Sequence, residues 1–131
     1  MKYLLDTNVL IELFKNNQQV RSAAAMAGLP NCSVSEITLA ELIYGANKGG
    51  FDRHYHEIEF VKKQITIHPI SNHIETYGRL RALVEKKGAR IDNFDLLIAA
   101  TALDRDLTLV THNAGYFERI PGLKLIDWEQ P

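Results

Sequence analysis

The chain lacks the features of membrane-spanning, secreted and disulfide-bonded proteins. No run approaches the ~20 consecutive apolar residues that cross a bilayer, and the N-terminal segment MKYLLDTNVLIELF carries Asp6 and Glu12 where a signal peptide would be apolar. A single cysteine, Cys32, excludes an internal disulfide and a cysteine-based zinc site. We therefore expect a cytoplasmic protein without membrane contact, in which Cys32 is a small buried side chain.

The chain also lacks an excess of positive charge. Its 131 residues include 15 Lys and Arg against 16 Asp and Glu, which gives a net charge of -1. Any binding of nucleic acid must therefore use a local patch. The basic residues available for phosphate contact, which on helices more often form a solvated face, are Lys48, Arg53, Lys62, Lys63, Lys86, Lys87 and Arg90.

What the sequence does contain is a regular alternation of short strand-like segments and longer helical ones. Apolar and β-branched runs predict strands at residues 2–5, 32–34, 68–70, 108–111 and 123–126. Apolar residues at helical spacing predict helices at 9–14, 20–27, 35–50, 51–65, 73–87 and 93–103. Ser71 or Asn72 is expected to cap the helix at 73–87, and Gly88 to end it. This alternation predicts one domain, residues 1–131, folded as a three-layer α/β/α sandwich around a central parallel sheet.

The first candidate for a functional residue is Asp6. It directly follows the first predicted strand, and ligands of parallel sheets collect beyond the carboxyl ends of the strands. The alternative is that Asp6 only caps the following helix, which is a common task for Asp. Position alone does not separate these two interpretations.

Glu41 and Asp95 are candidates because of the helix faces on which they lie. Glu41 falls beside the apolar positions Ile37, Ala40 and Tyr44. Asp95 falls within a predicted core-facing stripe that comprises Ile91, Ile98, Ala99 and Ala102. Carboxylates are rarely buried without a partner, so a functional site is indicated. The alternative for Asp95 is a buried ion pair with Arg79, Arg81 or Arg90.

Three acids that meet at one edge of a sheet require a compensating positive charge. A close pair of carboxylates repels by up to ~4 kcal/mol at an effective dielectric constant of about 20. Mg²⁺ and Mn²⁺ prefer carboxylate oxygen and water, and none of the three acids has the neighbouring His or Cys of a zinc site. Asp6, Glu41 and Asp95 therefore predict a magnesium or manganese centre.

Three polar residues, 111–113, follow residues 108–110 of the strand predicted in this region and are expected at the same edge as Asp6 if the two strands are neighbours. Thr111 is the first of them. Asn113 is a candidate to hold a metal-bound water, or alternatively to cap the short turn at 114–118. His112 is a single histidine, which is more often a surface residue, and we do not count it as catalytic.

Four motifs in this order resemble those of VapC toxins, the PIN-domain endoribonucleases of bacterial type II toxin-antitoxin systems. They are LDTN at 5–8, TLAELIYG at 38–45, NFDLLIAA at 93–100 and THN at 111–113. The segment FERIPGL at 117–123 and the pair Asp127-Trp128 also look like the closing part of that family. The resemblance therefore extends over essentially the whole chain and implies a PIN-like fold.

The resemblance assigns roles to individual residues. It implies that Asp6, Glu41 and Asp95 are catalytic and hold the metal. It implies that Thr7 and Asn8 orient the first acid and that Thr111 hydrogen-bonds to the acids. Many relatives carry a fourth acid where Asn113 and Tyr116 stand here, so we expect one firmly held metal ion.

The resemblance also implies the partners of such a protein. These are an RNA substrate, often a transfer RNA, a VapB-type antitoxin that blocks the site, and a second copy of the chain in a homodimer. The helical segments at 9–14 and 44–60 are the natural candidates for the protein contacts.

Two other functions remain open at this point. One is a degenerate PIN domain that acts as a non-catalytic binding module, in which the acids serve only the structure. The other is a phosphoryl-transfer protein with an aspartyl-phosphate at Asp6, although Asn8 stands where haloacid-dehalogenase phosphatases carry a second Asp.

Overall fold

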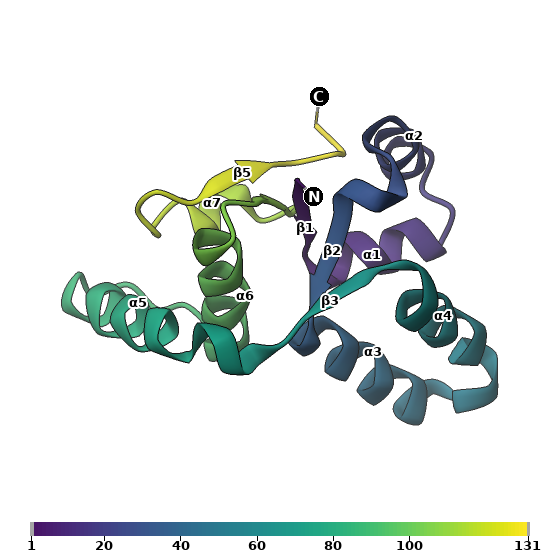
Figure 1. The fold of residues 1–131 in the computed structure, drawn as a ribbon, viewed down its shortest axis with the longest axis horizontal. Helices are drawn as coiled ribbons and strands as arrows, with labels where there is room; N and C mark the ends of the chain where they lie inside the picture. The colour runs from purple at the N-terminus through teal and green to yellow at the C-terminus, as the bar shows by residue number, and fades with distance from the viewer. Residues whose placement is uncertain (1, 131) are drawn as a thin grey trace.

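Five short parallel strands form the centre of the computed structural model, which describes residues 2–130 apart from the side chains of Phe51 and Arg53. The strands are β1 (Tyr3–Leu5), β2 (Cys32–Ser35), β3 (Thr66–His68), β4 (Thr108–Val110) and β5 (Lys124–Ile126). They lie in the order β3-β2-β1-β4-β5, and each neighbouring pair is parallel (Figure 1). The predicted central parallel sheet is confirmed.

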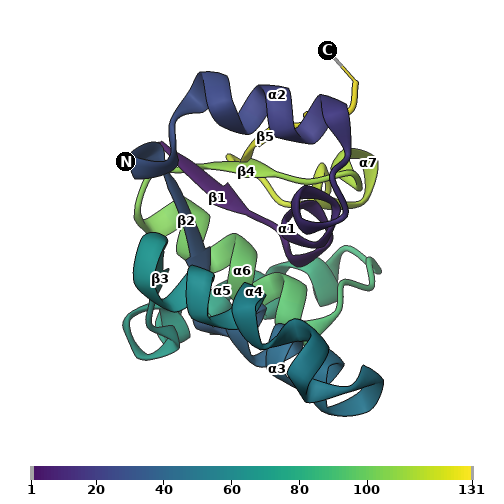
Figure 2. The ribbon, with the colours of Figure 1, turned by 90° about the vertical axis from the view of Figure 1, so that its right-hand side faces the viewer.

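Helices cover both faces of this sheet, as Figures 1 and 2 show. One layer contains α1 (Thr7–Phe14), α2 (Gln18–Ala27) and α4 (Phe51–Gln64), and the opposite layer contains α5 (Ile74–Lys86) and α6 (Asn93–Asp104). The helix α3 (Glu36–Gly49) continues from the end of β2, and the short α7 (Ala114–Phe117) follows β4. Two 3-10 turns, Leu29–Asn31 and Ile70–His73, precede β2 and α5. The predicted three-layer sandwich is confirmed.

Alternate residues of the central strands point into two separate cores. Leu4 and Leu109 pack with side chains of α5 and α6, whereas Leu5 and Val110 pack with side chains of α1, α2 and α4. All four are at most 1% exposed, which explains why these strands are almost continuously apolar. Cys32 is buried, as predicted. No helix within residues 2–130 has the length and apolar character needed to span a bilayer.

The edge strand β3 and the start of α5 differ from the sequence prediction. β3 occupies Thr66–His68 rather than 68–70, because Pro69 has no N–H to donate to a sheet ladder. α5 has no side-chain cap, so the prediction that Ser71 or Asn72 caps it is wrong. The 3-10 turn leads directly into the helix instead, which is a common way to satisfy the first backbone groups. The other predicted boundaries lie within two residues of the observed ones.

Candidate active site

The candidate site lies where the order of the strands reverses. From the central strand β1 the chain builds β2 and β3 on one side and then β4 and β5 on the other. Open parallel sheets bind ligands in the crevice beyond the carboxyl ends of the strands at such a reversal. Asp6 follows β1 and Thr111 follows β4, so both lie at this point.

Asp6 is held in one orientation by both neighbouring segments. Its N–H donates to the carbonyl oxygen of Val110 at 2.9 Å. Its Oδ1 accepts from the N–H of Thr7 and its Oδ2 from the hydroxyl of Thr111, each at 2.9 Å. The side chain is only 6% exposed. Asp6 therefore caps α1 and also lies at the mouth of the sheet, so the two interpretations of its sequence position are compatible.

A hydrogen bond from Thr7 connects Glu41 to the same crevice. Ser35 caps α3 by accepting from the N–H of Ile37 at 3.0 Å, and Glu41 follows on this helix. The hydroxyl of Thr7 donates to Glu41 Oε1 at 2.6 Å and lies 3.0 Å from the hydroxyl of Thr38. These contacts fasten the start of α1 to α3 and hold the Glu41 carboxylate beside Thr7, the residue that follows Asp6.

The apolar stripe that first suggested Glu41 is not a buried face. Ile37 is buried, but Ala40 is exposed and Tyr44 is 65% exposed. Glu41 is half-buried and accepts a hydrogen bond from Thr7, while two of the three apolar positions around it are exposed.

Asp95 lies in the first turn of α6 and is half-buried. The stripe around it is buried as predicted, at Ile91, Ile98, Ala99 and Ala102. Within residues 2–130 no ion pair joins Asp95 to Arg79, Arg81 or Arg90, since Arg79 donates to Thr76 and Arg81 pairs with Glu85. The ion-pair alternative is therefore wrong.

The carboxylates act on one another electrostatically. Burial first, and then the charges of Asp6, Asp92 and Glu41, raise the pKa of Asp95 to about 6, although a hydrogen bond from Tyr116 opposes the change. Burial also raises the pKa of Asp6, against the hydrogen bonds from Thr111 and Thr7 and the charge of His112. We call Asp6, Glu41, Asp92 and Asp95 the acid cluster.

Asp92 belongs to the site but was not chosen from the sequence, and Tyr116 was noted there only because it stands near the position of the relatives' fourth acid. Asp92 caps α6, since its Oδ2 accepts from the N–H of Phe94 at 3.1 Å. Its own N–H donates to the Tyr116 hydroxyl at 2.7 Å, and that hydroxyl also hydrogen-bonds to Asp95. Asp92 precedes Asp95 by one helical turn, which was a usable signal. Nothing in the sequence placed Tyr116 against this helix.

His112 and Asn113 lie beside the acid cluster in different ways. His112 Nδ1 is 3.2 Å from Asp127 Oδ1, and its Nε2 is 3.6 Å from Glu129 Oε1. Asn113 donates its N–H to the Thr111 hydroxyl at 3.0 Å, and its side chain is exposed. Because Asn113 makes no side-chain capping bond to α7, the interpretation of its side chain as a cap is wrong.

Asn8 is exposed, and within residues 2–130 it makes no hydrogen bond to Asp6. Thr7 and Thr111 make those bonds instead. The role that the resemblance implies for Asn8 therefore stays a prediction.

The acid cluster suits a hard divalent cation by its donor chemistry. Burial raises the pKa of Asp6, and burial together with the charges of Asp6, Asp92 and Glu41 raises the pKa of Asp95; a bound cation would oppose both shifts. Among residues 2–130 no three His, Cys, Asp or Glu side chains form a ready-made metal cage. Mg²⁺ does not need one, since it usually keeps several waters and binds one or two carboxylates.

Comparison with known proteins places this geometry in a family. A family model described as the PIN domain matches residues 3–123. Ribonuclease VapC1 of Haemophilus influenzae strain R2866 is 36% identical, and tRNA(fMet)-specific endonuclease VapC of Salmonella typhimurium is 35% identical, each over 98% of both chains. The crystal structure of VapBC2 from Rickettsia felis bound to a promoter DNA fragment contains a chain with a TM-score of 0.87 and 32% identity, over 98% of this chain and 99% of that one. The chain therefore belongs to the PIN-domain family, among its VapC members.

Proposed function

We propose that this protein is an endoribonuclease toxin that hydrolyses phosphodiester bonds of RNA at the acid cluster with Mg²⁺ or Mn²⁺. The observation that carries the proposal is the position of Asp6 at the strand reversal, where Thr7 and Thr111 hold its two carboxylate oxygens and the Thr7 hydroxyl also holds the Glu41 carboxylate. The charges of Asp6, Asp92 and Glu41 also act on Asp95, whose pKa they raise. The names of the relatives support RNA as the substrate.

The residues of the chain have separate tasks in this reaction. Asp6 and Asp95, with Glu41, would hold the cation, which when bound activates a water and stabilises charge on the phosphate. Thr7 and Thr111 fix both oxygens of Asp6, so its carboxylate needs little reorganisation during the reaction. The Thr7 hydroxyl orients Glu41 in the same way. The side chain of Asn113 remains available to hold a water at the exposed side of the site.

The substrate and the protein partners are proposed from the relatives. The name tRNA(fMet)-specific endonuclease supports a transfer RNA as the substrate, and the VapBC complexes among similar structures support a VapB-type antitoxin. A groove of about 180 Å³ between α1, α3 and α4 has Glu41 in its wall and an apolar lining that includes Phe14, Leu42 and Ile58. An amphipathic antitoxin segment seated there would cover one member of the acid cluster. We also propose that two copies of the chain form a homodimer.

Cleavage of RNA by the purified protein tests the function. The protein without antitoxin should cut transfer RNA when Mg²⁺ or Mn²⁺ is present, and EDTA should stop the reaction. Asp6→Asn should abolish cleavage while circular dichroism shows an intact fold. Asp106→Asn, the same change at an exposed residue outside the site, should cut normally.

Three results would contradict parts of the proposal. Retained metal-dependent cleavage by a folded Asp6→Asn variant removes Asp6 from the mechanism. Absence of cleavage, with a melting temperature that does not respond to Mn²⁺, favours a non-catalytic binding module. A stable acyl-phosphate on Asp6 after incubation with a phosphoryl donor favours the phosphoryl-transfer alternative.

A further inference from the structure

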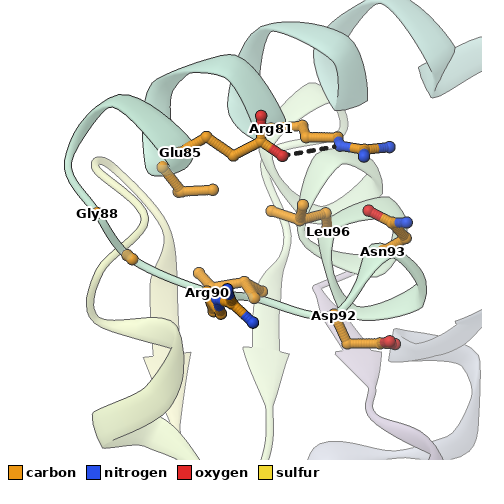
Figure 3. A pocket seen from close by; sticks show the side chains of 10 residues that line it. Arg81, Glu85, Gly88, Arg90, Asp92, Asn93 and Leu96 are labelled. Atoms are coloured by element: carbon orange, nitrogen blue, oxygen red, sulfur yellow. Dashed lines mark hydrogen bonds and ion pairs between the residues drawn. The ribbon is translucent and has the colours of Figure 1, made fainter.

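A crevice of about 700 Å³ lies next to the acid cluster, between the end of α5, the loop 88–92 and the start of α6 (Figure 3). Gly88 ends α5 with a φ of +73°, and the chain then passes beneath the last turns of this helix. Asp92 lines the crevice and also belongs to the acid cluster. The crevice and the candidate active site therefore share Asp92.

The lining combines an apolar floor with a polar rim. Val84, Ile91 and Leu96 form the floor and are at most 8% exposed. Arg90 and Asn93 are exposed members of the rim. A flat apolar group of a ligand would find contacts on the floor, and its polar edges would find donors and acceptors on the rim.

Arg90 differs from the other arginine of this crevice in having no partner. Arg81 donates to Glu85 at 3.1 Å and to the Tyr77 hydroxyl at 3.0 Å. Arg90, by contrast, makes no ion pair or hydrogen bond to any residue in the described range 2–130. Its guanidinium is therefore free to bind a ligand, and the planar donor set of Arg matches a phosphate group.

We propose that this crevice binds one nucleotide of the RNA, adjacent to the phosphodiester that is cut; the inference rests on the function proposed above. Arg90 contacts the phosphate, the base lies on the floor formed by Val84, Ile91 and Leu96, and the Asn93 amide meets the polar edge of the base. The volume falls within the ~300–1,000 Å³ of ordinary ligand pockets. Arg81 is paired with Glu85, and Asp92 adds a negative charge to the lining, so the attraction for phosphate depends mainly on the unpaired Arg90.

The first test is independent of cleavage. The wild-type protein in EDTA is titrated with a nucleoside 5′-monophosphate, and backbone amide shifts are followed by NMR. We expect shifts concentrated at Gly88, Arg90 and Asn93, which Arg90→Ala should remove. Lys124→Ala, the same loss of charge at the first residue of the edge strand β5, should leave them unchanged. Shifts elsewhere, or equal shifts in Arg90→Ala, would overturn the proposal, and a full response to inorganic phosphate alone would overturn the base contact.

The second test uses the RNA cleavage reaction. Arg90→Ala should raise KM about tenfold with little change in kcat, as expected for the loss of a charge-assisted contact that does not touch the reacting atoms. Arg90→Lys should recover part of the affinity, and Lys124→Ala should behave as wild type. Equal KM values for Arg90→Ala and Lys124→Ala would refute this inference while RNA cleavage itself persists. If the wild-type protein cuts no RNA, the proposed function fails, and the nucleotide titration still decides whether the crevice binds.

Discussion

Replacing Asp95 by Asn in the metal-free protein tests the electrostatic description of the acid cluster. The pKa of the Asp95 carboxyl rises from 3.8 to about 6, first through burial and then through the charges of Asp6, Asp92 and Glu41. When folding raises the pKa of a carboxyl, the folded state becomes less stable as the pH rises from the unfolded-state pKa to the folded-state pKa. The charge on Asp95 therefore costs folding free energy at about pH 7 and nothing below about pH 3.

The size of the effect follows from this shift. A difference of ~2 pKa units corresponds to about 3 kcal/mol. Asp95 is only half-buried, so solvent screening reduces the expected gain of Asp95→Asn to about 1–2 kcal/mol. For a domain of this size the melting temperature should then rise by about 4–8 °C.

Differential scanning calorimetry in EDTA at several pH values between about 3 and 8 measures the gain. Asp106→Asn is a matched control, because its side chain is 90% exposed and its φ of +54° is one that Asn tolerates. The melting temperature of this control should differ little from wild type at any pH. The quantity to compare is the stability gain of Asp95→Asn over wild type. If this gain at about pH 7 does not exceed the gain at about pH 3, the repulsion argument is wrong. Mn²⁺ should stabilise the wild-type protein more than the variant.

Three further changes test other parts of the structure. Thr7→Val keeps the shape but removes the 2.6 Å hydrogen bond to Glu41, so kcat for RNA cleavage should fall about tenfold in a folded variant. Burial raises the pKa of Asp104, but hydrogen bonds from Thr76 and His73 outweigh it and the net pKa is lowered. In urea titrations Asp104→Asn should therefore be less stable than wild type at neutral pH, and this difference should vanish as the pH falls through the folded pKa. Phe117→Ala should cost about 3–5 kcal/mol of unfolding free energy, measured in the same titrations, because Phe117 is 1% exposed in the core.

The order of the elements and the place of the site were predictable because both follow from local rules. The apolar segments before Asp6 and Thr111 are short and almost fully buried, as expected of central parallel strands. In a parallel sheet all carboxyl ends lie on one edge, so two residues 105 positions apart in sequence could be expected at the same edge. Asp95 was recognisable because its helix neighbours are buried.

The contacts that complete the site depend on tertiary packing and were not predictable. Tyr116 reaches Asp95 only because the turn after β4 lies against the start of α6. Glu41 was selected for a reason that the structure does not support, since what holds it is a hydroxyl from α1 and not an apolar helix face. The unpaired state of Arg90 depends on the path of one loop, which helical periodicity does not describe.

The hydrogen bond between Asp6 and Thr111 has a consequence for the synthesis of the protein. Asp6 is synthesised 105 residues before its partner Thr111, and β1 stays unpaired on one side until β4 has been made. Closing so long a loop must wait until most of the polypeptide exists. A chain translated only as far as α6 therefore carries the acids but not their arrangement, which is completed only after β4 and Thr111 have been made.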